Sequence, residues 1–444
     1  MRSKKGAVIV AGAFAFTLVL TACQQGSSSN GGDDKTTDAA TGEGTSDAPA
    51  EVVNLTFQSL AGQPATIAET ERIVNEWNEA NPDIQVEIVP AGWDGIYDKL
   101  VTQFNGDAAP DIIHFEASGI RPFAVDGYIA DLSPYLSDDL KSDISDGVWE
   151  AVTVDDQIIG LPTMMQSYMV FANTDLLAAA GVEVPTGDTM TWEQFREIAK
   201  ASSVNGTYGL GWGLKNPTAT VMSLSMGNGG DFFSGSGTDV EIEVGEAELA
   251  VPETIHAMAY EDASIMPVTL TQSGSEVLAS FYGGQIAMTV QGSFQATNIA
   301  NDAPEGFNWT VLPPLEGSVG SAQSANPQTM SVNVDSEHVE ESVAFLEFLM
   351  EPANLAALNY ADALIPTTAG ARTELATLAE GQTGWDQILK SGDALSAPAF
   401  LKVDLYQQWN ETVATPALPR YLANQSDSAG LQTELTDGRA HVNR

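Results

Sequence analysis

The chain has 444 residues, 43% of them hydrophobic and eight of them Trp, which is the composition of a packed globular protein. Its formal net charge at pH 7 is −43, and the acidic residues are spread along the whole chain. Nucleic acid is therefore not expected as a partner. The charge favours a solvated, self-repelling surface that keeps the protein soluble and monomeric.

The beginning of the chain has the pattern of a bacterial secretion signal. Basic residues precede an apolar run over residues 7–20, which is too short for a confident membrane span. The run ends in Leu-Thr-Ala-Cys at 20–23, which looks like a lipobox. We therefore expect a signal peptide over 1–22 and a lipid, such as palmitate, on Cys23, which would hold the protein at the extracytoplasmic face of the cell membrane.

Several kinds of chemistry are not expected in the folded body. Cys23 is the only cysteine, which rules out an intramolecular disulfide, a cysteine metal site and a catalytic thiol there. The four histidines are isolated and lack metal-ligand spacing: His114, His256, His338 and His441. No glycine-rich nucleotide motif occurs, so neither a metal nor a cofactor is predicted.

A composition change separates a tether from the body. Residues 23–50 carry no large apolar side chain, and we predict that they form a flexible linker behind the lipid. The remainder, 51–444, is longer than one core usually supports. Two folded lobes are therefore expected.

Hydrophobic periodicity at the start of the body alternates between the strand and the helix pattern. It predicts strands and helices in turn, over residues 53–57, 73–80, 84–88, 97–104 and 111–115. This alternation favours a three-layer α/β lobe with a mainly parallel sheet, in which ligands bind beyond the carboxyl ends of the strands. The third strand reaches that edge near residues 114–119.

Two later helices are also predicted. Thr191 and Gln194 form a capping-box pattern, so a helix should begin at Trp192. A buried helix is expected over 343–349, ending before Pro352. No internal repeat of fixed period occurs, which argues against a solenoid or a propeller.

Short segments in a fixed order resemble one protein family. They lie at residues 106–112, 159–162, 171–177, 191–195, 281–294, 311–314, 344–349 and 365–367. Together they resemble the extracellular solute-binding proteins of sugar ABC importers, the group that includes maltose-binding proteins. The resemblance implies an α/β, two-lobe, periplasmic-binding-protein-like (type II) clamshell with the ligand in a cleft between the lobes.

The resemblance also implies domain limits and partners. It places one lobe at 51–163 plus 330–350 and the other at 164–329 plus 351–444. The protein would be a binder and not an enzyme. Its partners would be a small polar solute, mono- or oligosaccharide in nature, and the permease subunits of an ABC transporter.

Candidate ligand contacts follow from position and from sugar chemistry, which needs aromatic plates for C–H faces and polar groups for hydroxyls. Phe115 and Glu116 follow the third strand, although core packing competes for Phe115. Phe294 follows Gly292 and Ser293, where the family commonly carries a stacking aromatic residue. The full set is Gln63, Trp93, Phe115, Glu116, Gln166, Trp212, Asn216, Phe294 and Tyr360.

Three further candidates come from other segments of the chain. Gln166 lies four residues after Pro162, where the resemblance implies a polar ligand contact. Trp212 and Asn216 belong to a glycine-rich stretch that is expected to form a flexible loop.

Two other classes of function stay open from the sequence. A secreted carbohydrate-active hydrolase could draw its acid and base from 60 carboxylates, but nothing selects a pair. A surface adhesin lipoprotein would share the anchor and the tether, but it would not need two lobes.

Overall fold

Alternating strands and helices open the folded body. A computed structural model describes residues 52–442, so the predicted signal peptide, Cys23 and the tether lie outside the described residues. The first elements are β1 (Val53–Ser59), α1 (Pro64–Ala80), β2 (Ile84–Pro90), α2 (Ile96–Asn105) and β3 (Ile112–Glu116). All five predicted elements are confirmed. Helix α1 begins at a proline, which fits a first helical position, and ends where Pro82 stops it.

A six-stranded sheet carries these strands in the order β17-β6-β16-β3-β1-β2. The added strands are β6 (Leu161–Met165), β16 (Gln328–Val332) and β17 (Ile365–Pro366). β1 pairs in parallel with β2 and β3, whereas β16, β6 and β17 pair antiparallel. Because β16 is antiparallel to both β3 and β6, the strands β1, β2, β3 and β6 run in one direction, and β16 and β17 run in the other. The expected mainly parallel direction is therefore correct for four of the six strands and wrong for β16, which returns from the second sheet, and for β17.

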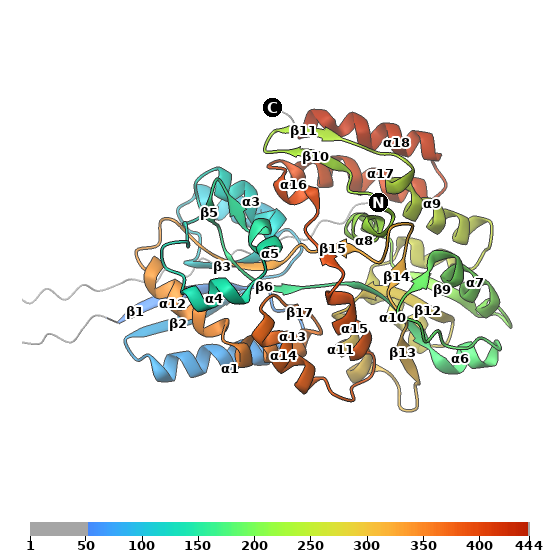
Figure 1. Cartoon of the computed structure of the whole chain (residues 1–444), viewed down its shortest axis with the longest axis horizontal. Coiled ribbons are helices and arrows are strands. Elements are labelled where there is room, and N and C mark those ends of the chain that lie inside the picture. Colours follow the sequence, from blue (N-terminus) through green and yellow to red (C-terminus); the bar gives the residue numbers. More distant parts are fainter. Residues whose placement is uncertain (1–51, 443–444) are drawn as a thin grey trace, which may run out of the picture. The chain divides into compact units, whose positions relative to one another are not determined.

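Helices cover both faces of this sheet (Figure 1). One face packs against α1, α12 (Val339–Leu349) and α13 (Pro352–Asp362), and the other packs against α3 (Ala117–Val125). Phe345 of α12 lies at the centre of the first interface, 5.9 Å from the ring of Phe57 and 5.7 Å from that of Trp77. The buried helix predicted over 343–349 is confirmed.

A second, four-stranded sheet has the order β13-β7-β12-β9. Its strands are β7 (Tyr168–Asn173), β9 (Tyr208–Trp212), β12 (Ile286–Gly292) and β13 (Trp309–Val311). Helices α6 (Thr174–Ala179), α7 (Trp192–Ser202) and α10 (Gly274–Tyr282) contact this sheet. Two more helices of this part of the chain are α9 (Glu246–Tyr260) and α11 (Gln295–Asp302). The capping box of Thr191 and Gln194 is present at the start of α7, as predicted.

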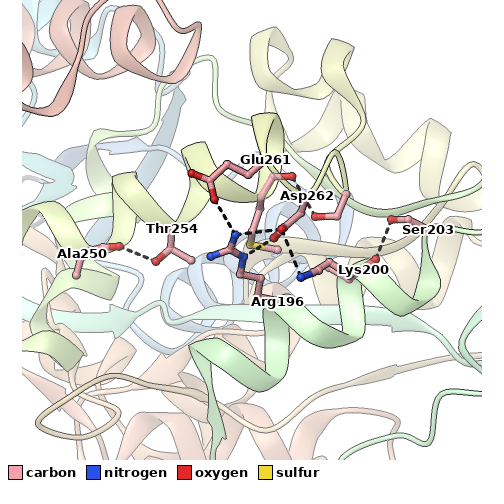
Figure 2. A network of polar contacts seen from close by, with 10 residues as sticks. Arg196, Lys200, Ser203, Ala250, Thr254, Glu261 and Asp262 are labelled. Carbon is pink, nitrogen blue, oxygen red and sulfur yellow. Dashed lines mark hydrogen bonds and ion pairs between the residues drawn. The ribbon is translucent and has the colours of Figure 1, made fainter.

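A polar network ties α7 to the end of α9 (Figure 2). The Arg196 guanidinium bonds both carboxylate oxygens of Asp262, with 3.0 Å from Nη2 to Oδ1. Lys200 Nζ lies 3.5 Å from the same carboxylate. Arg196 holds the pKa of Asp262 below its ordinary value, so this carboxylate stays ionised at neutral pH.

The chain passes between the sheets at several points. β6 runs into β7 after two residues, and β15 (Gln323–Ser324) precedes β16. The segment after residue 350, expected in the second lobe, first contributes α13 and β17, which pack on α1 and pair with β6. The other predicted lobe limits stay a prediction.

The rest of the chain consists of shorter elements. The helices are α4 (Asp138–Asp143), α5 (Asp146–Ala151), α8 (Thr218–Ser225), α14 (Ala369–Leu378), α15 (Trp385–Gly392), α16 (Tyr406–Trp409), α17 (Thr415–Leu422) and α18 (Ser428–Asp437). The strands are β4 (Thr153–Val154), β5 (Gln157–Ile158), β8 (Met190–Thr191), β10 (Phe233–Ser236), β11 (Asp239–Ile242), β14 (Leu315–Glu316) and β18 (Leu395–Ser396). No helix within 52–442 is both long and apolar enough to cross a membrane.

Candidate functional site

A cavity of about 300 Å³, here called the first cavity, lies where β1, β2 and β3 end. This is the edge at which α/β sheets bind ligands. Its lining residues are Leu60, Ala61, Gly62, Gln63, Thr66, Trp93, His114, Glu116, Met164, Gln166, Phe294, Gln328, Asp362 and Leu364. Five of the predicted site residues are therefore brought together: Gln63, Trp93, Glu116, Gln166 and Phe294.

The start of α1 forms one wall of the first cavity. Gln63 is the N-cap residue, and its side chain makes no hydrogen bond to the first turn. The first N–H groups of the helix thus receive no cap from Gln63 and can serve as donors to a ligand. Thr66, one turn into the helix, adds a buried hydroxyl.

Trp93 supplies a large aromatic surface at this cavity. It lies in the turn between β2 and α2 and is 40% exposed. Its ring packs edge-on against His114, with 5.7 Å between ring centroids. An exposed indole held in place by a neighbouring ring suits contact with the C–H face of a sugar.

His114 is fixed as a neutral hydrogen-bonding residue. Its Nδ1 accepts a bond from the Leu60 N–H at 3.1 Å, so its Nε2 carries the proton and donates to Gln328 Oε1 at 2.7 Å. Burial lowers the pKa of His114 to about 4, which keeps the ring uncharged at neutral pH. This hydrogen bond fixes the orientation of the Gln328 side-chain amide. The NH₂ group of Gln328 can therefore donate to a ligand.

Two carboxyl groups line the first cavity. Glu116 Oε1 accepts bonds from Ser118 Oγ and Gln407 Nε2, each at 3.3 Å, and burial raises the pKa of Glu116. Asp362, the last residue of α13, has its pKa raised to about 7 by burial, and the Thr66 hydroxyl opposes this shift. Both groups can accept bonds from hydroxyls. No Lys or Arg is among the described residues that line the cavity.

Phe294 reaches the cavity from the second sheet. It follows β12, and its position depends on Gly292: a Cβ atom there would lie 2.4 Å from Phe294 Cε1 and 3.1 Å from Gln166 Oε1. The Ser293 N–H donates to the Ser167 carbonyl at 2.7 Å, which ties this turn to the chain crossing after β6. Glycine is thus required for the ring and the amide to lie side by side.

The structure does not bring the other predicted residues to the first cavity. Trp212 ends β9, is 1% exposed and stacks on Trp192, so the expected flexible loop is wrong there. Asn216 is exposed elsewhere, and Tyr360 stacks on Trp385 with 5.2 Å between ring centroids. Phe115 does not line the first cavity either: it is 4% exposed and its ring fills the space beside Gly119, although it lines a second, neighbouring cavity.

Sequence reasoning missed several lining residues. Asp362, Thr66, Gln328 and His114 were not singled out as contacts, and His114 was considered only as a metal ligand, which its isolation in the sequence argued against. Strand-end position was the available signal for His114, which lies beside Glu116. Asp362 and Gln328 come from α13 and β16, so only the folded chain brings them here. No group of three metal-ligating residues occurs within 52–442.

Known proteins resemble this chain in sequence. The family model of the bacterial extracellular solute-binding proteins matches residues 61–356. An uncharacterized lipoprotein in the oleD 5' region of Streptomyces antibioticus is 38% identical over 87% of this chain and 86% of its own length. The galactooligosaccharide-binding protein of Bacillus subtilis is 21% identical over 62% of this chain and 64% of its own length.

Solved structures share the fold. The GacH receptor of Streptomyces glaucescens, studied unliganded and with acarbose, superposes with a TM-score of 0.75 at 20% identity, over 88% of this chain and 98% of that one. Maltose-bound T. maritima MalE3 gives a TM-score of 0.74 at 18% identity, over 88% and 99%.

These likenesses confirm the predicted α/β, two-lobe periplasmic-binding-protein fold. The family consists of binding proteins, so the expectation that the chain is not an enzyme is confirmed as well. With a family model that covers residues 61–356 and a relative 38% identical along most of the chain, this protein belongs to the bacterial extracellular solute-binding proteins.

Proposed function

We propose that the protein captures a carbohydrate outside the cytoplasm and delivers it to the permease of an ABC importer. The first cavity carries this proposal, because it combines the aromatic rings of Trp93 and Phe294 with amide and carboxyl groups. Such a lining matches the apolar C–H faces and the hydroxyl belt of a sugar. The lack of Lys and Arg among its described lining residues disfavours an anionic solute.

The names of relatives support a sugar ligand. Proteins with similar sequences are called galactooligosaccharide-binding in Bacillus subtilis and lactose-binding in Rhizobium radiobacter. A further relative in Escherichia coli is a putative ABC transporter periplasmic-binding protein.

The predicted contacts are proposed to divide into two groups. Gln63, Trp93, Glu116, Gln166 and Phe294 are proposed to bind the ligand, together with Asp362 and Gln328, which line the same cavity. Trp212, Asn216 and Tyr360 are proposed to have no contact with it. Phe115 belongs to neither group, because it lies outside the first cavity and lines a second one beside it.

A thermal-shift screen tests the ligand class. Neutral mono-, di- and trisaccharides, amino acids, short peptides and sugar phosphates should be compared. A ligand at 100 times its Kd stabilises the folded state by about 2.7 kcal/mol. Stabilisation by neutral sugars alone is expected, and stabilisation by amino acids, peptides or sugar phosphates instead would contradict the proposal.

The membrane anchor is proposed to be a lipid on Cys23. The Leu-Thr-Ala-Cys sequence at 20–23 supports it, and so does the lipoprotein relative in Streptomyces antibioticus. In a bacterial expression host, Cys23→Ala should move the protein from the detergent phase to the aqueous phase or block its processing. Unchanged partitioning of a variant that is still processed would rule out this anchor.

A further inference from the structure

A second cavity of about 200 Å³ adjoins the first one. Its lining residues are Trp93, Gly95, Ile96, Tyr97, Asp98, Phe115, Glu116, Gln407 and Glu411. Trp93 and Glu116 line both cavities, so the two spaces are neighbours at these two side chains. A ligand that contacts Trp93 in the first cavity therefore lies next to the second cavity.

The second cavity has the same chemical character as the first. Aromatic surface comes from Trp93, Tyr97 and Phe115. Polar groups come from Asp98, Glu116, Gln407 and Glu411, and no Lys or Arg is among its described lining residues. Aromatic rings beside acceptor groups suit a second uncharged polyhydroxyl unit, whereas an anionic unit would be repelled.

Contacts from distant parts of the chain build this cavity. Gln407 of α16 is 7% exposed and donates to Glu116 Oε1 at 3.3 Å. Arg121 of α3 pairs with Asp404 at 2.9 Å, which holds the segment before α16 against the first sheet's helices. Glu411 lies in the π-helical turn Asn410–Ala414, and such turns often occur at functional sites.

Size favours occupation of both spaces. Ligand pockets in proteins usually measure about 300 to 1,000 Å³, so the first cavity alone is at the lower limit of that range. We propose that the ligand is at least a disaccharide, with one unit in the first cavity and the next beyond Trp93 in the second cavity. This inference rests on the proposed sugar-binding function and narrows its ligand class.

Calorimetric titration with two length series tests the inference: glucose, maltose and maltotriose, and galactose, lactose and galactosyllactose. In at least one series the disaccharide should bind at least tenfold more tightly than its monosaccharide. Affinities of mono- and disaccharide within threefold of each other would overturn the second subsite while leaving sugar binding intact. If no member of either series binds, the proposed function fails, and the inference fails with it.

Variants of Glu411 locate the second unit. Glu411 is exposed and lines the second cavity but not the first. Glu411→Trp should fill the space and lower disaccharide affinity to that of the monosaccharide, and Glu411→Ala should lower it three- to tenfold. Glu374→Trp, at an exposed position of α14 outside both cavities, is the matched control. It should still bind the disaccharide more tightly than the monosaccharide, by the same factor as the wild type. If Glu411→Trp has a native melting curve and still binds the disaccharide more tightly than the monosaccharide by the wild-type factor, the second unit lies elsewhere and the proposal is overturned.

Discussion

Asp362 is a carboxyl group whose ionisation should affect stability near neutral pH. Burial raises its pKa to about 7, against about 3.9 in an unfolded chain. The folded state therefore binds more protons than the unfolded state between these values. The favourable contribution of Asp362 to the stability of the folded state is complete below about pH 4 and is lost as the pH rises through about 7.

The variant Asp362→Asn should remove this dependence. Relative to wild type, its free energy of unfolding should rise from pH 4 to pH 8, by on the order of 3 kcal/mol, because a neutral amide pays no ionisation cost. Urea denaturation at several pH values measures the difference. A difference that stays constant across this range would show that Asp362 ionises as an ordinary surface carboxyl.

Phe294 should contribute more to ligand affinity than to folding. Its ring is partly buried and lines the first cavity, so Phe294→Ala removes a face that the ligand contacts. Affinity should fall by up to about thirtyfold, or about 2 kcal/mol, while the melting temperature stays near that of the wild type.

Phe281→Ala is the control for this prediction, since Phe281 is fully buried in the core. It should cost about 3 to 5 kcal/mol of stability and leave affinity intact in the folded fraction. If Phe294→Ala behaves like Phe281→Ala, then Phe294 is a packing residue and not a ligand contact.

The sequence located part of the cavity because strand ends are readable from periodicity. Gln63 and Trp93 follow β1 and β2, Glu116 is the last residue of β3, and all three line the first cavity. Trp212 was misplaced because glycines suggested a loop. In the fold, Gly209 and Gly211 instead let β9 pack closely, since Cβ atoms there would lie 1.8 Å from Ala199 O and 2.4 Å from Ile286 Cδ1.

At the scale of elements, Asp262 is the largely buried carboxylate of the network that links α7 to the end of α9. The Asp262 side chain is 7% exposed and bonds Arg196, whereas the neighbouring Glu261 is 71% exposed and bonds the same guanidinium at 3.2 Å. A largely buried partner of a guanidinium contributes more than an exposed one.

Asp262→Asn should therefore cost about 1 to 2 kcal/mol of stability at pH 7, and Glu261→Gln less than about 0.5 kcal/mol. Because the pKa of Asp262 is lowered, its contribution is present above the unfolded value near 3.9 and is lost as the pH falls through the folded value. Urea denaturation of both variants at pH 7 checks the order. Equal costs would mean that the network acts only as surface charge.

Elements were easier to predict than their directions. Local periodicity and capping identified β1, α1, β2, α2, β3, α7 and α12, because each pattern lies within its own segment. The direction of β16, opposite to that of β1, β2, β3 and β6, was missed, because it depends on where the chain crosses between the two sheets. β17 contains only two residues and pairs with β6 across some 200 positions of sequence, so no local pattern marks it.

At the scale of the whole molecule, contacts between the first sheet's helices and the C-terminal segment bear on closure around a ligand. Arg121 and Asp404 form an ion pair whose side chains are only 13% and 17% exposed. Lys402 pairs with Glu150 at 2.7 Å. These pairs hold α3 and α5 to the segment that carries Gln407, and so they help to build the second cavity.

Ligand binding should compact the protein, because two-lobe binding proteins close around their solute by hinge motion. Small-angle scattering should give a smaller radius of gyration with a saturating sugar than without it. A sugar of the same size that does not bind the protein serves as the control.

Asp404→Ala should weaken the affinity for the ligand, because it leaves Arg121 unpaired in a largely buried place and loosens the segment beside the ligand. If the radius of gyration is unchanged by a confirmed tight ligand, and Asp404→Ala lowers only the melting temperature, then these ion pairs are permanent packing contacts and the ligand enters a cleft that does not close.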